Sequence, residues 1–289
     1  MPVNTMTGTA NPYAESIRRM TNDLRFFEQK YQGKFLEPPH IGLGNRKTRC
    51  VNEATLPIIT CHPSCLEKCA GTCYVLRICT NLRPNCRRCQ AKNTVLRRID
   101  PKAYYEYFYS EAERLGLPIR LSDGGDFENG EQVKACFAAA RRHPAVQSIL
   151  YTKRFELLRD MVHHPANVHI RYSSWEGDEK NTEYARKLGF DVTYVVYDGS
   201  GNCPYQKSLA RFASRKRKMA AELRRQGLGT KEANRRAEHL AERECPVWHC
   251  RNCAQQGVGC CRRGDIRFNV VGAADWAVKA ENAAHSPNR

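Results

Sequence analysis

The distribution of cysteine constrains this chain more than any other feature of its sequence. Fifteen cysteines occur among 289 residues, and most of them fall into two dense groups, Cys50 to Cys89 and Cys245 to Cys261. A chain of this length can bury a sufficient core without covalent cross-links, so its stability does not require disulfides. Clustering of this kind therefore favours metal ligation over disulfide pairing.

The chain shows no sign of export or membrane insertion. Its N-terminal residues contain no apolar segment of signal-peptide length, and no apolar run elsewhere approaches the ~20 residues that span a bilayer. We therefore expect a cytoplasmic protein without a membrane partner. A reducing compartment of that kind keeps thiolates available to ligate iron or zinc.

The charge balance is strongly basic and is concentrated in one segment. The chain carries 47 Lys and Arg against 30 Asp and Glu, a formal net charge of +17. Residues 207–243 hold twelve Lys or Arg and four Glu, and they predict two helices separated by the QGLG turn. Such a segment suits phosphate contacts with nucleic acid, with little sequence preference because Phe212 is its only aromatic residue. A basic solvated surface with no dedicated partner is the alternative.

Periodicity predicts an N-terminal helix followed by alternating strands and helices. Residues 12–31 place apolar side chains at helical spacing, and the apolar run LPIIT at 56–60 predicts a strand that ends at Cys61. Further strands are predicted at 118–122, 148–153, 167–175 and 191–199. Helices are predicted at 91–99, 101–116, 130–143, 155–164 and 182–189.

This alternation predicts the fold class. Five strand and helix units in succession imply a parallel sheet with right-handed crossovers, so we expect an α/β protein built as a partial (β/α) barrel. The expected segments are an N-terminal helix (1–40), the barrel core with a cysteine loop (41–205), a basic helical insert (206–244) and a cysteine-rich C-terminal segment (245–289).

The loops after the predicted strands carry polar residues. Loops of this kind meet at one edge of a parallel sheet, where chemistry is usually located. Each residue alone is typical of a solvated turn, but the set shares one edge with the cysteine loop and together favours a site. These residues are Asp123, Gly124, Gly125, Asp126, Lys153, Arg154, Ser173, Ser174, Glu176 and Asp178.

The first cysteine group is CHPSCLEKCAGTCY, in which Cys61, Cys65, Cys69 and Cys73 are separated by three residues each. Zinc sites usually pair their cysteines and separate the pairs by a longer loop, whereas iron-sulfur loops run several cysteines in quick succession. The spacing therefore favours a cluster over zinc. Pro63 and Gly71 favour a loop that wraps around its ligand.

The spacing of two other sets of cysteines does not identify which metal they would bind. The C-terminal group contains a Cys-x-x-Cys pair with flanking cysteines, which indicates either zinc or a second iron-sulfur cluster. Its candidate ligands are Cys245, Cys250, Cys253 and Cys260. Cys86 and Cys89 form a separate pair that could belong to a small zinc site or remain free thiols.

The order of several short motifs resembles the phage-encoded gene product eighty-eight family. The motifs are LGN at 43–45, LPIITCHPSC with its following cysteines, RLSDGGDF, LYTKR, NVHIRYSSWEG and the final CP....C..C pattern. The resemblance covers roughly residues 41–205 and 245–275. Members of that family are in turn similar to radical S-adenosylmethionine proteins.

That resemblance implies a set of site residues. In radical S-adenosylmethionine enzymes three loop cysteines hold a [4Fe-4S] cluster, and a Gly-Gly-acidic turn after the second strand binds the methionyl amine of the cofactor. Here the turn would be Gly124, Gly125 and Asp126, with Lys153, Arg154, Ser173 and Glu176 lining the pocket. The usual loop has intervals of three and then two residues, whereas this loop has three throughout and a fourth cysteine that would close the cluster.

Three functions remain open from the sequence. The first is a radical S-adenosylmethionine-like iron-sulfur protein of unknown substrate, with nucleic acid as a candidate substrate. The second is a non-catalytic, zinc-stabilised nucleic-acid-binding protein. The third is an electron-transfer protein with a closed cluster, and a redox role of either kind would require an electron donor. A phage-encoded member would act in the host cell cytoplasm.

Overall fold

The computed structural model describes residues 13–43, 50–68, 73–77, 84–175, 177–196, 204–244 and 266–269. Its strands are β1 (Val51–Ala54), β2 (Ile119–Gly124), β3 (Ser148–Thr152), β4 (Val168–Ser174), β5 (Asp191–Val196) and β6 (Ile266–Asn269). Its helices are α1 (Ala14–Tyr31), α2 (Cys65–Lys68), α3 (Tyr74–Arg77), α4 (Pro84–Ile99), α5 (Pro101–Leu115), α6 (Gly130–Arg142), η3 (Phe155–Leu157), α7 (Leu158–Met161), α8 (Glu179–Lys187), α9 (Pro204–Arg225) and α10 (Thr230–Glu244). No helix within these ranges is both long and apolar enough to cross a bilayer.

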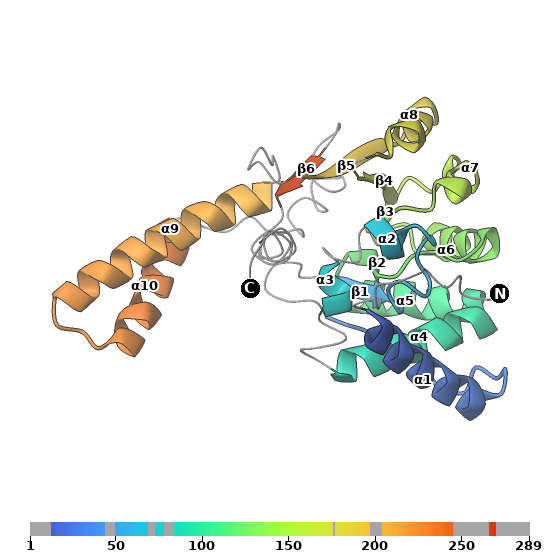
Figure 1. Cartoon of the computed structure of the whole chain (residues 1–289), viewed down its shortest axis with the longest axis horizontal. Helices are drawn as coiled ribbons and strands as arrows, with labels where there is room; N and C mark the ends of the chain where they lie inside the picture. Colours follow the sequence, from blue (N-terminus) through green and yellow to red (C-terminus); the bar gives the residue numbers. More distant parts are fainter. Residues whose placement is uncertain are drawn as a thin grey trace, which may run out of the picture.

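The described strands form one parallel sheet in chain order. Neighbours in the sheet are successive strands from β1 to β6, and every pair is parallel. Right-handed crossovers between such strands place the connecting helices on one face. Figure 1 shows α5, α6, α7 and α8 following one another along the outer side of the sheet. The predicted α/β class with a parallel sheet is therefore confirmed.

Local sequence signals set the limits of the helices α5 and α6. At the start of α5 the Asp100 carboxylate accepts a hydrogen bond from the Ala103 N–H at 3.0 Å, and Pro101 occupies the first turn. The helix ends at Gly116, whose φ of 61° is left-handed and suits glycine. Asn129 caps α6 in the same way, accepting from the Gln132 N–H at 3.0 Å.

The core between sheet and helices is rich in aromatic side chains. Tyr104, Tyr105, Phe108 and Tyr109 of α5 are fully buried. Burying a large apolar side chain contributes about 1.5–3 kcal/mol, so this one helix face supplies much of the core's stability. On the outside, α1 packs against α4 with four buried residues at helical spacing, as its periodicity predicts. These are Met20, Leu24, Phe27 and Tyr31.

Two predictions about the strands need correction. The strand expected at 56–60 is wrong, because the strand is β1 at Val51–Ala54 and residues 57–59 form a turn. Ile58 has a left-handed φ of 67°, and the Thr60 N–H donates to the Leu56 carbonyl at 3.2 Å, which closes the turn. In addition, β6 extends the sheet beyond β5, whereas the sequence predicted no strand there.

A buried charge joins α4 to the first two strands. Arg97 of α4 has no exposed surface, and its Nη1 lies 3.5 Å from an oxygen of Glu53 on β1, which is itself 1 % exposed. The Glu53 carboxylate also accepts hydrogen bonds from the Tyr104 hydroxyl and the Ser122 N–H, both at 2.8 Å. Arg97 Nη2 donates to the Asp126 carbonyl at 2.7 Å. The network thus spans α4, α5, β1 and the turn after β2.

Breaking this buried pair should destabilise the fold strongly. We expect Glu53→Gln to lower the free energy of unfolding by about 3 kcal/mol, because the buried Arg97 would then keep only the Glu128 carboxylate, 3.6 Å from its Nη2. Denaturant unfolding followed by circular dichroism measures this change. The double variant Glu53→Gln with Arg97→Met should cost less than the sum of the two single variants. Glu131→Gln, which removes the exposed Lys134–Glu131 pair, is the control and should change little; additive effects at Glu53 and Arg97 would contradict the coupling.

Candidate metal centre

The first cysteine loop starts from the end of β1 and lies at the carboxyl ends of the strands. After β1 the chain turns at Leu56–Thr60, and Cys61 follows directly. The loop carries Cys61, Cys65 and Cys73, of which Cys65 is buried and the other two are partly exposed. The loop therefore leaves the sheet at the edge where the polar residues were expected.

Contacts of the loop place it over the neighbouring strands. The His62 ring packs against the Phe155 ring at 5.1 Å between centroids, just after β3, and His62 Nε2 lies 3.9 Å from Glu156. Burial and the hydrogen bond to Asp178 raise the pKa of Tyr172 on β4, and Cys65 lies close enough to contribute to that increase. The loop thus runs from β1 across the ends of β3 and β4.

Cys73 has different neighbours. Its sulfur accepts a hydrogen bond from the Leu76 N–H at 3.4 Å, at the start of α3. Burial raises the pKa of Tyr13, and Cys73 contributes to the increase, which places this thiol beside the residue that precedes α1. Cys65 and Cys73 therefore have different surroundings on the loop.

The thiols are suitable ligands for iron or zinc in kind, but they are not assembled. Within the described ranges, no three His, Cys, Asp or Glu side chains lie close enough together to hold a metal ion. Cys69 lies outside the described residues, as do the C-terminal candidates Cys245, Cys250, Cys253 and Cys260. The predicted ligand sets thus remain predictions, of which the structure describes three members.

The predicted Gly-Gly turn packs directly against the entry to the cysteine loop. A Cβ on Gly125 would lie 2.2 Å from Thr60 Oγ1 and 2.3 Å from Thr55 Oγ1, and one on Gly124 would lie 2.8 Å from Val75 Cγ1. Gly125 also has a left-handed φ of 75°. The two glycines are therefore required for close contact between this turn and the chain on either side of the loop.

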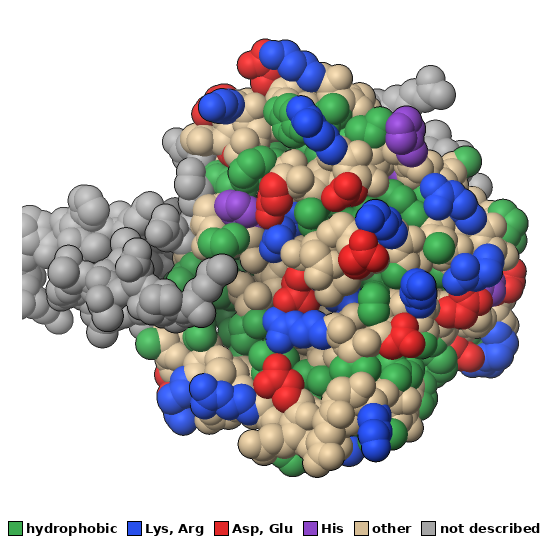
Figure 2. Space-filling model, turned by 90° about the vertical axis from the view of Figure 1, so that its right-hand side faces the viewer, with side chains coloured by type: hydrophobic (Ala, Val, Ile, Leu, Met, Phe, Trp, Pro, Cys, Tyr) green, Lys and Arg blue, Asp and Glu red, His purple; other side chains and the backbone are tan. Residues whose placement is uncertain are grey.

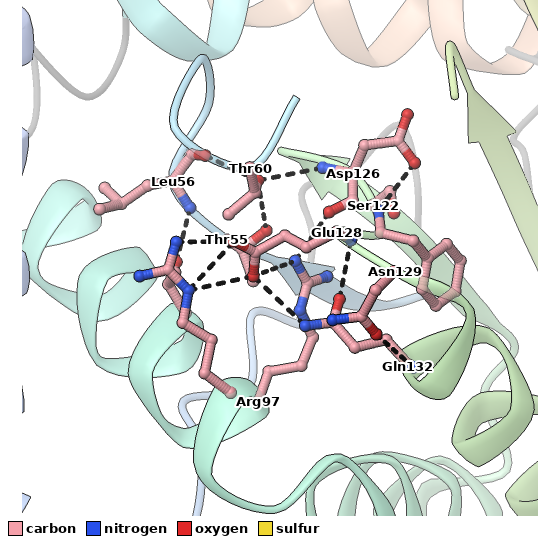
Figure 3. Close-up of polar contacts among 12 residues, drawn as sticks. Thr55, Leu56, Thr60, Arg97, Ser122, Asp126, Glu128, Asn129 and Gln132 are labelled. Carbon is pink, nitrogen blue, oxygen red and sulfur yellow. Dashed lines mark hydrogen bonds and ion pairs between the residues drawn. The ribbon is translucent and has the colours of Figure 1, made fainter. Parts of the chain in front are cut away.

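Thr60 links the turn to the loop through hydrogen bonds. Its hydroxyl donates to the Leu56 carbonyl at 2.8 Å and accepts from the Asp126 N–H at 3.1 Å. Figure 3 shows Thr60 between these two partners, with Arg97 reaching the same region from α4. The residue before Cys61 is thus held against the turn by its side chain and its packing.

Asp126 is directed into the protein and ties β2 to β3. It is 4 % exposed, and its carboxylate accepts hydrogen bonds from the Lys153 N–H at 2.8 Å, the Phe127 N–H at 2.8 Å and the Thr152 hydroxyl at 3.0 Å. Burial raises the pKa of this carboxyl to about 6, although the hydrogen bonds favour the ionised form. The described hydrogen bonds of the Asp126 carboxylate thus all go to groups of the protein, at the ends of β2 and β3.

The other expected pocket residues are only partly brought together. Lys153 Nζ lies over the Trp175 ring, 5.6 Å from its centroid, so the ends of β3 and β4 meet. Arg154 Nη2 donates to the Glu128 carbonyl at 2.9 Å. Ser173 is half-buried on β4 opposite Thr193 of β5. Glu176 lies outside the described residues.

Sequence reasoning missed the residues that hold this edge in place. Glu53, Thr55, Thr60 and Arg97 were not among the candidates. Glu53 lies in a strand and Arg97 in an amphipathic helix, where single charged residues usually face solvent. The available signal was the position of Thr60 immediately before the first loop cysteine.

Substitution of Gly125 tests the contact between turn and loop. Gly125→Ala should lower the free energy of unfolding by more than about 2 kcal/mol, because it adds a steric overlap to the cost of a left-handed backbone. Gly189→Ala is the matched control, since its φ is 86° but nothing lies within 4 Å of the added Cβ. It should cost only about 1 kcal/mol. Equal costs in thermal or denaturant unfolding would show that Gly125 does not carry this contact.

Comparison with known proteins places the chain in a family. A family model described as Gene product 88 matches residues 23–263, which is well over half of the chain and includes both cysteine groups. No curated protein and no solved structure matches this chain. The family prediction made from the motif order is therefore confirmed, and the chain belongs to the gene product 88 family.

Proposed function

We propose that this chain is an iron-sulfur protein similar to radical S-adenosylmethionine proteins, with a [4Fe-4S] cluster held by three of Cys61, Cys65, Cys69 and Cys73. The observation that carries the proposal is the position of three cysteines, Cys61, Cys65 and Cys73, on one loop at the carboxyl ends of β1, β3 and β4. Loops at this edge of a parallel sheet are the usual place for chemistry. The expected partial barrel, with this loop at its mouth, is part of the same proposal.

The chemistry of the loop favours a metal that is acquired together with local order. Thiolates gathered on one loop without a metal repel one another, and a metal cation removes that repulsion. Metal sites of this kind rarely exist before the metal binds, so binding and ordering of the loop are coupled.

The residues around the loop would position it. Gly124 and Gly125 hold the entry to the loop against β2, and Asp126 fixes the turn to Thr152 and Lys153. When bound, a cluster of the proposed kind supplies single electrons, which in the proteins that the chain resembles cleave the sulfonium of S-adenosylmethionine. The protein's own part is to orient the loop and limit access of water.

A second candidate function is a zinc-stabilised nucleic-acid-binding protein without catalytic activity. The observation that favours it is the basic helical hairpin formed by α9 and α10. In this case both cysteine groups would bind zinc, and the purified protein would be colourless. Metal analysis of material prepared without oxygen distinguishes the two functions directly.

The ligand assignment is tested by iron content. After anaerobic reconstitution, Cys73→Ala should lose most of the iron and acid-labile sulfide that the natural sequence retains. Cys136→Ala is the control, because Cys136 is a fully buried thiol in α6, close to Tyr109 and away from the loop. Its iron content should be unchanged. Unchanged iron in Cys73→Ala, or zinc without iron in the parent protein, would reject the proposed cluster.

Binding of S-adenosylmethionine is a separate part of the proposal. Adding it to the reduced, reconstituted protein should change the electron paramagnetic resonance signal of the cluster and yield 5′-deoxyadenosine. The open iron that remains when only three cysteines ligate is the reason to expect both effects. A signal that does not change, together with full iron content, would instead support a closed cluster that transfers electrons.

A further inference from the structure

The helices α9 and α10 form a hairpin that extends away from the sheet. Figure 1 shows the two helices side by side, projecting to the side opposite α6 and α8. Gly227, with φ of 89°, lies in the connection between them. The contact between them is built from small buried residues, which allow the helices to approach closely. These residues are Ala220, Ala233, Ala237 and Ala241.

Ion pairs hold the two helices together and use acidic residues of the hairpin. Arg215 Nε lies 2.6 Å from Glu244, and Lys216 Nζ lies 2.8 Å from Glu238. Within α10, Glu232 pairs with both Arg235 and Arg236 at 2.7 and 2.8 Å. Within α9, Glu222 pairs with Arg225 at 2.6 Å. Residues 211–244 contain eleven Lys or Arg but five Glu, so cations remain in excess.

The excess cations are exposed. Six of them form no ion pair with any residue in the described part of the chain, namely Arg211, Arg217, Lys218, Arg224, Lys231 and Arg243. Arg211 and Lys218 are seven residues apart on α9, so they lie on the same face of the helix. That face is opposite the Ala220 contact with α10. The hairpin therefore presents a row of uncompensated positive charge to solvent.

The body of the protein distributes its charges differently. Figure 2 shows acidic and basic side chains interspersed over the face of the body opposite the hairpin. Many of them form pairs across or along the helices, such as Arg142–Glu106, Arg98–Glu128 and Lys187–Glu183. The uncompensated charge of the hairpin is thus a local property and not a feature of that surface.

The composition of the hairpin selects among polyanionic partners. An anionic membrane would require an exposed apolar face, but the small apolar face is used between the helices, and Leu240 is the one large hydrophobic residue of α10 exposed. Single-stranded nucleic acid would require aromatic platforms, and Phe212 is the only Phe, Tyr or Trp in residues 211–244. Contacts with the phosphates of a duplex need cations alone.

We propose that the α9–α10 hairpin is a binding arm for duplex nucleic acid, which it contacts through backbone phosphates and without reading bases. The proposal depends on the exposed cations of α9 and is independent of the iron-sulfur proposal. The feature that the hairpin recognises is the pair of phosphate backbones of a double-stranded nucleic acid. It requires no metal, and it would survive the loss of the cysteine loop.

The test compares two double variants of the full-length chain that lose the same charge. One is Arg211→Gln with Lys218→Gln, and the other is Arg235→Gln with Arg236→Gln, whose cations are already paired with Glu232. Binding to a short labelled duplex of random sequence is measured by fluorescence anisotropy over a series of NaCl concentrations. Circular dichroism verifies that both variants retain their helices.

The first variant should weaken binding at every salt concentration and reduce the slope of log Kobs against log salt by about 2, one for each lost phosphate contact. The second should have a smaller effect on both quantities. Equal weakening by the two variants would show that bulk charge is responsible and would overturn the proposal. Tighter binding to a single strand of the same length, or to vesicles of anionic lipid, would also overturn it.

Discussion

The fold at the candidate site depends on the buried guanidinium of Arg97. A fully buried charge is costly unless it is compensated, and here Glu53, Glu128 and the Asp126 carbonyl lie around it. The partners come from β1 and from the turn after β2, so the charge can be satisfied only when helix, strand and turn are assembled together. The buried network at Arg97 therefore links α4, β1 and the turn after β2 in a way that an apolar side chain at this position would not.

The network has a direct consequence for the cysteine loop. Glu53 is next to the end of β1, and Asp126 follows the Gly-Gly turn that contacts Thr55 and Thr60. Through these contacts the residues that lead into Cys61 are held in a fixed position, while the thiols beyond them have separate surroundings. The buried network and the glycine turn therefore position the start of the cysteine loop.

The sequence predicted the repeating part of the fold better than the site. The strands at β2 to β5 were found because each combines an apolar run with a turn and is followed by a helical pattern. The run at 56–60 was misassigned because a short apolar segment fits either a strand or a buried turn, and Pro57 with a left-handed Ile58 makes it a turn. The strand β6 is only four residues long, Ile266–Asn269, and it was missed because so short a segment has no clear period.

The charged residues have different environments in the two parts of the chain. They are paired and partly buried in the body, but many on the hairpin are exposed and form no ion pair with the described residues, and composition alone does not reveal this difference. In the body, Arg97 and Glu53 are removed from water and depend on each other, so added salt should hardly affect them. On the hairpin, Arg211 and Lys218 are exposed, so their attraction for phosphates acts over about a Debye length, ~8–10 Å at physiological salt. The same residue types therefore stabilise the body, whereas in the proposed binding arm they face solvent. The net charge of +17 describes neither, because what matters is which cations already have an anion beside them.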